Sequence, residues 1–306
     1  METNSSESSY AGYTYLLGKF DQTGMPHWHT SFVSRSGVHK LKVRNDVIHE
    51  FYPPRYWPGE TVGAHLEFAL KYDGTNLGLL ALIFEQVSQI ELTEYIKSKP
   101  TGKYSRRIWF FYEFLTKERL PIDDAASGNY VDALEKKYYY TVQNGDKSPR
   151  HRIVNNLLGP STFCPVIRRT EKLSQLDSTD MRKRCEDIVT AYPPELLRRA
   201  LNYLYNKETK SSFAIEHIKP DSSRTEKFIA SLSLAEKEDF CEKERLIELQ
   251  NLIVDPRFQD RDYRKSKNYV GQAVAYLNEV IHYVCPKPSD LPGLMSGLID
   301  SHKRMQ

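Results

Sequence analysis

The chain has 306 residues, of which 43 are lysine or arginine and 40 are aspartate or glutamate, so its formal net charge is +3. Hydrophobic residues make up 40% and charged residues 27%, which is ordinary globular usage and excludes a collagen-like, coiled-coil or wholly disordered chain. A dedicated nucleic-acid-binding domain is usually more basic, so we do not expect a nucleic-acid partner. At about 100–200 residues per domain, the length suits two or three domains.

The cysteines and the N-terminus indicate the compartment. No two of the four cysteines have the spacing of metal ligands: they are Cys164, Cys185, Cys241 and Cys285. Such usage is typical of a reduced, intracellular protein. The N-terminus is polar and acidic, without the basic start and apolar core of a signal peptide. Apolar runs such as 77–84 are far shorter than the roughly 20 residues that span a bilayer. We therefore expect a cytoplasmic protein with no membrane partner.

The first 58 residues are expected to form a tail and short strands. Polar and apolar residues alternate over 38–43 and 47–52, a pattern that predicts one or two short strands. His27 and His29 lie two residues apart without a third ligand type nearby. We therefore interpret this pair as part of a loop and not as a metal site.

Residues 59–194 are interpreted as a mostly helical N-terminal domain. Apolar residues recur at helical spacing over 61–72, 77–97, 104–115 and 173–192. The third of these segments contains several consecutive aromatic residues, among them Trp109, Phe110 and Phe111. Aromatic residues at helical spacing are usually core, so we expect these side chains to be buried and not to form a stacking platform for bases.

Residues 195–306 combine further helices with one hairpin. Helices are predicted over 195–206, 211–216, 222–234, 235–254 and 291–302. Between them, β-branched and aromatic residues over 269–284 are typical of a β-hairpin. The sequence contains no P-loop, no G-x-G-x-x-G, no G-x-S-x-G and no H-E-x-x-H motif. Motif searching alone therefore predicts no activity.

Two segments of this C-terminal part are informative when they are read together. The first is 211–217, Ser-Ser-Phe-Ala-Ile-Glu-His. The second runs from Tyr263-Arg264 through Lys267-Asn268-Tyr269-Val270-Gly271 to Cys285-Pro286-Lys287-Pro288. In this order they resemble the Fic family of AMP-transferases, in which an inhibitory helix, [ST]-x-x-x-E-[GN], precedes a hairpin called the flap. Shorter upstream matches at 52–57, 100–107, 128–131 and 163–170 extend the resemblance over about residues 50–306.

The resemblance implies an enzyme that uses ATP and Mg²⁺ to transfer AMP to a hydroxyl group of a target protein. In that family the catalytic loop, H-x-F-x-[DE]-G-N-G-R, supplies the proton acceptor, the metal ligand and the phosphate cradle. This sequence contains no such loop, and its one Asn-Gly pair is Asn144-Gly145. We therefore expect no catalytic residue and no metal ligand in this chain, no tight binding of ATP or Mg²⁺, and no AMP transfer by the chain alone. We interpret the chain as ending before the loop.

The resemblance also assigns regulatory and docking residues. Ser212 and Glu216 match the inhibitory motif, where the glutamate would pair bidentately with an arginine of the catalytic loop and displace the γ-phosphate of ATP. His217 departs from the family's Gly or Asn, so its effect on the helix turn is left open. In the flap the target peptide would pair with the edge of the hairpin. The corresponding residues are Tyr263, Arg264, Asn268, Tyr269, Val270 and Gly271.

The expected fold class is mainly α: an incomplete, helical Fic-like domain with a β-hairpin flap, preceded by a mixed, mostly helical N-terminal domain. The expected function is that of the N-terminal, regulatory portion of a Fic-family protein adenylyltransferase. Its partners would be a target protein at the flap and a Fic catalytic core in cis or in trans. The alternative is a stand-alone inhibitor or interaction module that acts on a separate Fic enzyme. A helical nucleic-acid or interaction scaffold is a third possibility, which the near-neutral charge disfavours.

Overall fold

The computed structural model describes residues 8–306 except 178, 216–225, 228, 231–240, 255–256, 258 and 276–277. The chain divides into an N-terminal unit, residues 1–161 with 165–169, and a C-terminal unit, residues 162–164 with 170–306. Helices account for 46% of the structure and strands for 16%, so the fold is mixed α/β. The sequence had led us to expect a mainly α fold, and the structure does not clearly have one. Several strands are only two to four residues long, too short to leave a periodic signal in the sequence. The expected domain boundaries after residues 58 and 194 stay predictions.

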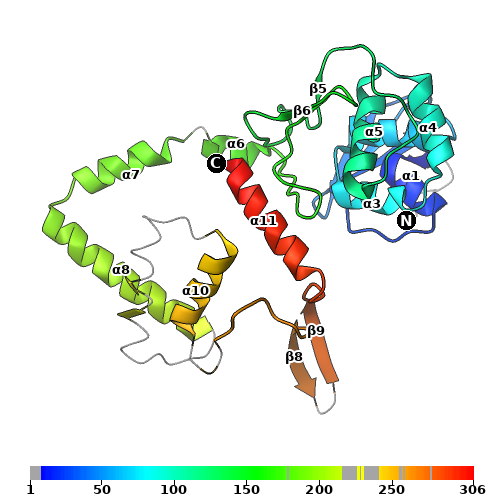
Figure 1. The fold of residues 1–306 in the computed structure, drawn as a ribbon. Helices are drawn as coiled ribbons and strands as arrows, with labels where there is room; N and C mark the ends of the chain where they lie inside the picture. Colours follow the sequence, from blue (N-terminus) through cyan, green and yellow to red (C-terminus); the bar gives the residue numbers. More distant parts are fainter. Residues whose placement is uncertain are drawn as a thin grey trace. The chain divides into compact units, whose positions relative to one another are not determined.

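The N-terminal unit, coloured blue to green in Figure 1, begins with a mixed sheet of order β1-β2-β4-β3. Its strands are β1 (Ser8–Ala11), β2 (His29–Ser34), β3 (Lys40–Arg44) and β4 (Val47–Tyr52). Strand β2 is antiparallel to β1 and parallel to β4, and β3 and β4 form a hairpin. Asn45 and Asp46 make its turn with φ of 50° and 60°, the left-handed pair that a two-residue type I′ turn requires. The strands predicted at 38–43 and 47–52 are confirmed.

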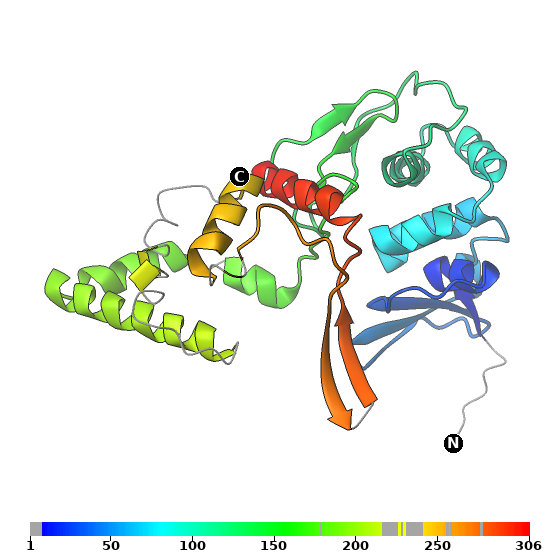
Figure 2. The same ribbon diagram turned by 60° about the horizontal axis from the view of Figure 1, so that its bottom comes forward.

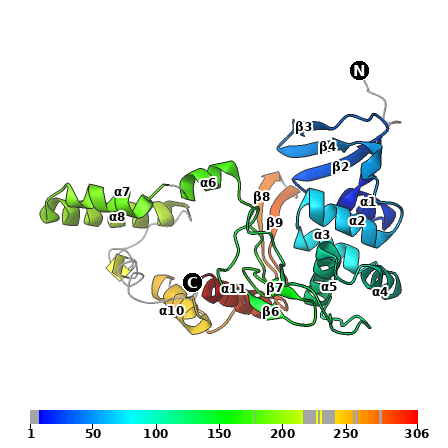
Figure 3. The same cartoon turned by 90° about the horizontal axis from the view of Figure 1, so that it is seen from above.

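Helices pack against this sheet and against one another (Figure 3). They are α1 (Gly12–Lys19), η1 (Pro54–Tyr56), α2 (Val62–Phe68), η2 (Ala69–Asp73), α3 (Leu77–Phe84), α4 (Gln89–Ser98) and α5 (Lys103–Thr116). Helix α1 and the π-helical turn η2 contact β2, and α5 contacts α2, α3 and α4. The single helix predicted over 77–97 is wrong: α3 and α4 are separate, because the backbone at Ser88 is extended, with ψ of 127°.

Helix α5 lies in the core of the N-terminal unit. Trp109, Phe110, Phe111 and Tyr112 are consecutive, and each is at most 5% exposed. A helix segment that is buried on all sides contributes core area, so these four side chains leave no open face on which bases could stack. The prediction that these residues are core, and not a base-stacking platform, is confirmed.

An ion cluster around Glu113, at the end of α5, holds the loops that follow. The Arg150 guanidinium donates to both carboxylate oxygens, from Nε to Oε2 at 2.8 Å and from Nη2 to Oε1 at 2.6 Å. His151 Nε2 lies 2.9 Å from Oε2, and the Leu120 N–H donates to Oε1 at 3.0 Å. Burial opposes ionisation, but these hydrogen bonds, with one from Trp109, outweigh it and lower the pKa of Glu113 to about 2. The cluster adjoins a small sheet of order β5-β7-β6, formed by β5 (Val131–Asp132), β6 (Asp146–Ser148) and β7 (Ile153–Asn155).

The C-terminal unit contains one hairpin among helices (Figure 2). Its elements are α6 (Glu171–Asp177), α7 (Met181–Thr190), α8 (Pro194–Ile215), α10 (Lys243–Ile253), β8 (Tyr269–Ala275), β9 (Asn278–Val284) and α11 (Leu291–Met305). The helix predicted over 173–192 is two helices, because the Asp180 side chain caps α7 by accepting a hydrogen bond from the Lys183 N–H at 2.9 Å. The two helices predicted over 195–206 and 211–216 form one continuous helix, α8, to Ile215.

The last helix, α11, is confirmed and docks on residues 162–164. The Ser301 hydroxyl is buried and donates to the carbonyl oxygen of Phe163 at 2.9 Å. Gly297 lies on the same face, where an added Cβ would come within 2.7 Å of the Phe163 Cβ. This close packing fixes the helix that follows the hairpin. Most of the helix predicted over 222–234 lies outside the described residues.

Candidate functional site

The hairpin of β8 and β9 contains the sequence-predicted docking residues Tyr269, Val270 and Gly271. The strands pair antiparallel from Tyr269 with Val284 to Ala275 with Asn278. The register shifts between Val270, which pairs with Tyr283, and Gly271, which pairs with Ile281. The backbones approach closely at this irregularity, where a Cβ on Gly271 would lie 3.1 Å from the Val280 carbonyl oxygen. This close approach explains why glycine suits the position.

Both outer edges of this hairpin lack a neighbouring strand in the described part of the chain, because the sheet has only the order β8-β9. Its apolar side chains are also largely exposed to solvent. The exposed fractions are 47% for Tyr269, 57% for Val270, 47% for Val280, 54% for Ile281, 56% for Tyr283 and 69% for Val284. Unpaired strand edges with exposed apolar side chains are templates for pairing with another chain.

Both ends of the hairpin are tied together at its base. The Cys285 N–H donates to the Asn268 carbonyl oxygen at 3.0 Å. The Arg264 guanidinium donates to the Ser266 carbonyl oxygen at 2.6 Å and also to the carbonyl oxygen of Pro286. The sequence-predicted residues Arg264 and Asn268 therefore close the base of the hairpin.

Tyr263, the first predicted docking residue, lies between α10 and α11. Lys243 of α10 has its Nζ 5.0 Å from the centre of the Tyr263 ring and 2.8 Å from Asp262 Oδ1. The hydrogen bond to Asp262 raises the pKa of Lys243, and the same contact lowers the pKa of Asp262. A cavity of about 520 Å³ beside this contact is lined by Tyr263 and Arg264 and by residues of both helices. Tyr263 thus anchors the hairpin to the helices of its own unit.

One hydrogen bond between side chains joins the two strands of the hairpin. The Tyr269 hydroxyl donates to Glu279 Oε2 at 2.9 Å. This hydrogen bond and the neighbouring negative charge raise the pKa of Tyr269. The phenol therefore stays protonated and pairs across the two strands.

The structure places only part of the predicted inhibitory motif. Ser212 lies in the last turn of α8. Glu216 and His217 follow Ile215 and lie outside the described residues. The motif is therefore attached to the end of a helix of 22 residues, while the relation of Glu216 to the hairpin stays a prediction.

Comparison of the chain with protein-family models, with curated proteins and with solved structures gives no significant match. The resemblance to the Fic family therefore rests on the ordered motifs alone. Among the described helices, none is both long and apolar enough to cross a membrane. Within the same residues, no group of three or more His, Cys, Asp or Glu side chains could hold a metal ion.

Sequence reasoning missed a second polar region, around His29 in the N-terminal unit. His29 begins β2 and is 7% exposed, so its assignment to a loop is wrong. Its Nδ1 lies 3.2 Å from Asp73 Oδ1 and its Nε2 2.7 Å from Glu50 Oε2. Burial opposes protonation, but the two carboxylates outweigh it and raise the pKa of His29. The local sequence gives no signal for this cluster, because its members are far apart in the chain.

Proposed function

We propose that the C-terminal unit is the regulatory and target-presenting part of a Fic-type AMP-transferase. In this proposal the segment that carries the catalytic loop acts in cis or in trans and transfers AMP from ATP to a hydroxyl group of a target protein. The fold of the unit would then be an incomplete, helical Fic-like domain. The order of the motifs at 211–217, 263–271 and 285–288 supports this assignment.

The observation that carries the proposal is the exposed hairpin of β8 and β9. The hairpin coincides with the segment in which the motif order predicts a flap. Neither of its outer edges is paired within the described residues. A target segment that adds as a further strand would be held by main-chain hydrogen bonds, which act independently of its sequence. Pairing of this kind fixes the register of the target and so presents one hydroxyl group.

The base of the hairpin supports the same role. The contacts of Arg264 with Pro286 and of Tyr263 with Lys243 hold both ends of the ribbon against its own unit. Docking of an extended peptide costs less entropy when the receiving edge is already ordered. ATP and Mg²⁺ would be held by the loop that this sequence lacks, so the proposal assigns docking and inhibition to this chain and no phosphate chemistry.

Proline in the hairpin tests the docking role. The test protein is a completed chain, defined here as the 306 residues joined to a Fic catalytic segment that contains H-x-F-x-[DE]-G-N-G-R. In the completed chain, Val280→Pro removes a strand N–H and distorts the ribbon. We expect transfer of label from α-³²P-ATP to target protein to fall by about tenfold or more, the equivalent of one or two lost hydrogen bonds.

The matched control is Val280→Thr, which keeps a β-branched side chain and the backbone donor. It should transfer label at close to the wild-type rate. Retention of full transfer by Val280→Pro would show that the hairpin does not present the target, and equal loss in both variants would assign the effect to the side chain and not to strand pairing.

A further inference from the structure

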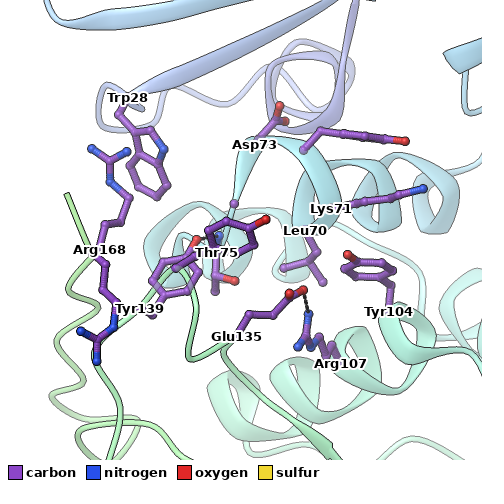
Figure 4. Close-up of a pocket in the computed structure, with 14 residues that line it drawn as sticks. Trp28, Leu70, Lys71, Asp73, Thr75, Tyr104, Arg107, Glu135, Tyr139 and Arg168 are labelled. Carbon is purple, nitrogen blue, oxygen red and sulfur yellow. Dashed lines mark hydrogen bonds and ion pairs between the residues drawn. The ribbon is translucent and has the colours of Figure 1, made fainter. Parts of the chain in front are cut away.

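A cavity of about 580 Å³ lies within the N-terminal unit, to which all of its lining residues belong. Its lining comes from segments that are far apart in the sequence. Figure 4 shows Trp28 and Arg168 on one side and Lys71 and Tyr104 on the opposite side, with Tyr139 between them. This volume lies within the range of about 300–1,000 Å³ that small-molecule sites occupy.

Arg168 provides a cation that no described residue neutralises. Its guanidinium lies 4.2 Å from the centre of the Trp28 ring. Among the described residues, no carboxylate or carbonyl group accepts a hydrogen bond from it. Burial lowers the pKa of Arg168, yet a guanidinium stays charged in proteins and presents five N–H donors. Because Arg168 is only partly buried, its N–H groups are available to an anion bound in the cavity.

The Asp73 carboxylate does not fill this role. Asp73 is 2% exposed, and the Ser31 hydroxyl donates to its Oδ1. His29 Nδ1 also lies 3.2 Å from Oδ1, and the Tyr13 N–H donates to Oδ2 at 3.1 Å. These partners satisfy the carboxylate within the core.

The second carboxylate of the lining, Glu135, is paired as well. Its Oε1 accepts from Arg107 Nη1 at 2.9 Å and lies 2.8 Å from Lys103 Nζ. Two cations therefore share one carboxylate at this side of the cavity. Lys71 lies on the same side, with its Nζ 4.9 Å from the centre of the Tyr72 ring. The charge that remains in the cavity is positive.

Aromatic side chains complete the walls. Tyr104 is half-buried opposite Arg168, and Tyr139 is 6% exposed, with its hydroxyl accepting from the Thr75 N–H at 2.7 Å. Aromatic faces and a guanidinium plane are the surfaces on which flat ligand rings stack. The combination favours a ligand that has both a planar ring and a negative charge.

We propose that this cavity binds a small organic anion with a planar ring, the chemistry of a nucleoside monophosphate. Arg168 receives the anionic group, the half-buried ring of Tyr104 receives the ligand ring, and Tyr139 closes the wall between them. The site lies in the N-terminal unit and does not depend on the function proposed for the C-terminal unit.

Calorimetric titration of the full chain with AMP, adenosine and inorganic phosphate tests the two parts of this recognition separately. We expect saturable binding of AMP with a Kd of about 1 mM or below, and binding of adenosine and of phosphate at least tenfold weaker. No saturable binding of AMP in that range would overturn the proposal. Adenosine or phosphate binding as tightly as AMP would overturn it too, since either the anionic group or the planar ring would then add nothing to the affinity.

Substitution of Arg168 locates the site. Arg168→Gln should weaken AMP binding by about tenfold or more, because hydrogen bonds between a guanidinium and a phosphate are stronger than those between neutral groups. Arg35→Gln, at an exposed position of the same unit, should leave binding unchanged, and both variants should keep the wild-type unfolding temperature. AMP binding that survives in a folded Arg168→Gln variant would contradict the assignment.

Discussion

Replacement of Glu113 by glutamine should destabilise the N-terminal unit by about 3 kcal/mol, the lower end of the effect of removing one partner from a buried ion pair. The amide cannot accept the paired hydrogen bonds of Arg150, which is only 12% exposed. Glutamine has a single acceptor oxygen, so either the Leu120 N–H or His151, which contact different oxygens of Glu113, would lose its acceptor. The guanidinium would be left with the exposed Asp124 as its carboxylate partner, 2.9 Å from Nη1. No other single carboxylate described here binds α5 to so much of the following loop.

Tryptophan fluorescence in a urea titration measures the free energy of unfolding of the N-terminal unit. All three tryptophans, Trp28, Trp57 and Trp109, belong to the N-terminal unit. The control is Glu94→Gln on α4, where the glutamate is exposed, and it should change the free energy of unfolding by less than about 0.5 kcal/mol. Equal unfolding midpoints for the two variants would contradict the role of the Glu113 cluster.

The pH dependence of stability should follow from the same carboxylate. The pKa of Glu113 is about 2 in the folded chain, below its value of about 4.3 in an unfolded chain. A lowered pKa adds stability above the unfolded value, and this stability is lost as the pH falls from about 4.3 toward 2. The wild-type free energy of unfolding should therefore fall more steeply over this window than that of Glu113→Gln.

The second large effect is expected in the inhibitory motif. In the completed chain, Glu216→Gly should raise transfer of AMP by about tenfold or more, since a charge-assisted, bidentate pair contributes roughly 1.5–3 kcal/mol. The reason is that the carboxylate of Glu216 would otherwise occupy the arginine that binds the γ-phosphate of ATP. Initial rates of label transfer at a fixed ATP concentration provide the measurement.

The matched control for this variant is Glu208→Ala, which removes an exposed glutamate from the same helix, α8. It should leave the rate of transfer unchanged. If both variants raise transfer equally, the effect belongs to the charge or stability of the helix and not to the motif. If neither raises it, residues 211–217 are not inhibitory.

The sequence predicted those elements whose pattern is local. The hairpin at 269–284, helix α11 and the aromatic helix α5 could be read from periodicity and from the prolines and glycines around them. The breaks at Ser88 and Asp180 could not, because a single extended residue or cap ends a helix without interrupting its apolar pattern. The short strands were missed for a similar reason, and their addition changed the fold from mainly α to mixed α/β.

The hairpin and the cavity of the N-terminal unit differ in how far the sequence alone could reveal them. The hairpin residues Tyr269 to Gly271 are contiguous, so a sequence motif alone could single them out as candidates. Trp28, Asp73 and Arg168 lie just before β2, at the end of η2 and in a later loop, and no spacing rule links them. Contacts of this kind depend on tertiary structure, so the cavity could be recognised only once the N-terminal unit was described.

The central claim is that this chain supplies the docking and inhibitory parts of a Fic-type active site. Its most direct test compares label transfer from α-³²P-ATP, with Mg²⁺ and a cell lysate, by three proteins. These are the 306-residue chain, the catalytic segment alone, and the completed chain with Glu216→Gly. We expect transfer to protein only by the completed chain. Robust transfer by the 306-residue chain alone, or a completed chain no more active than the catalytic segment, would contradict it.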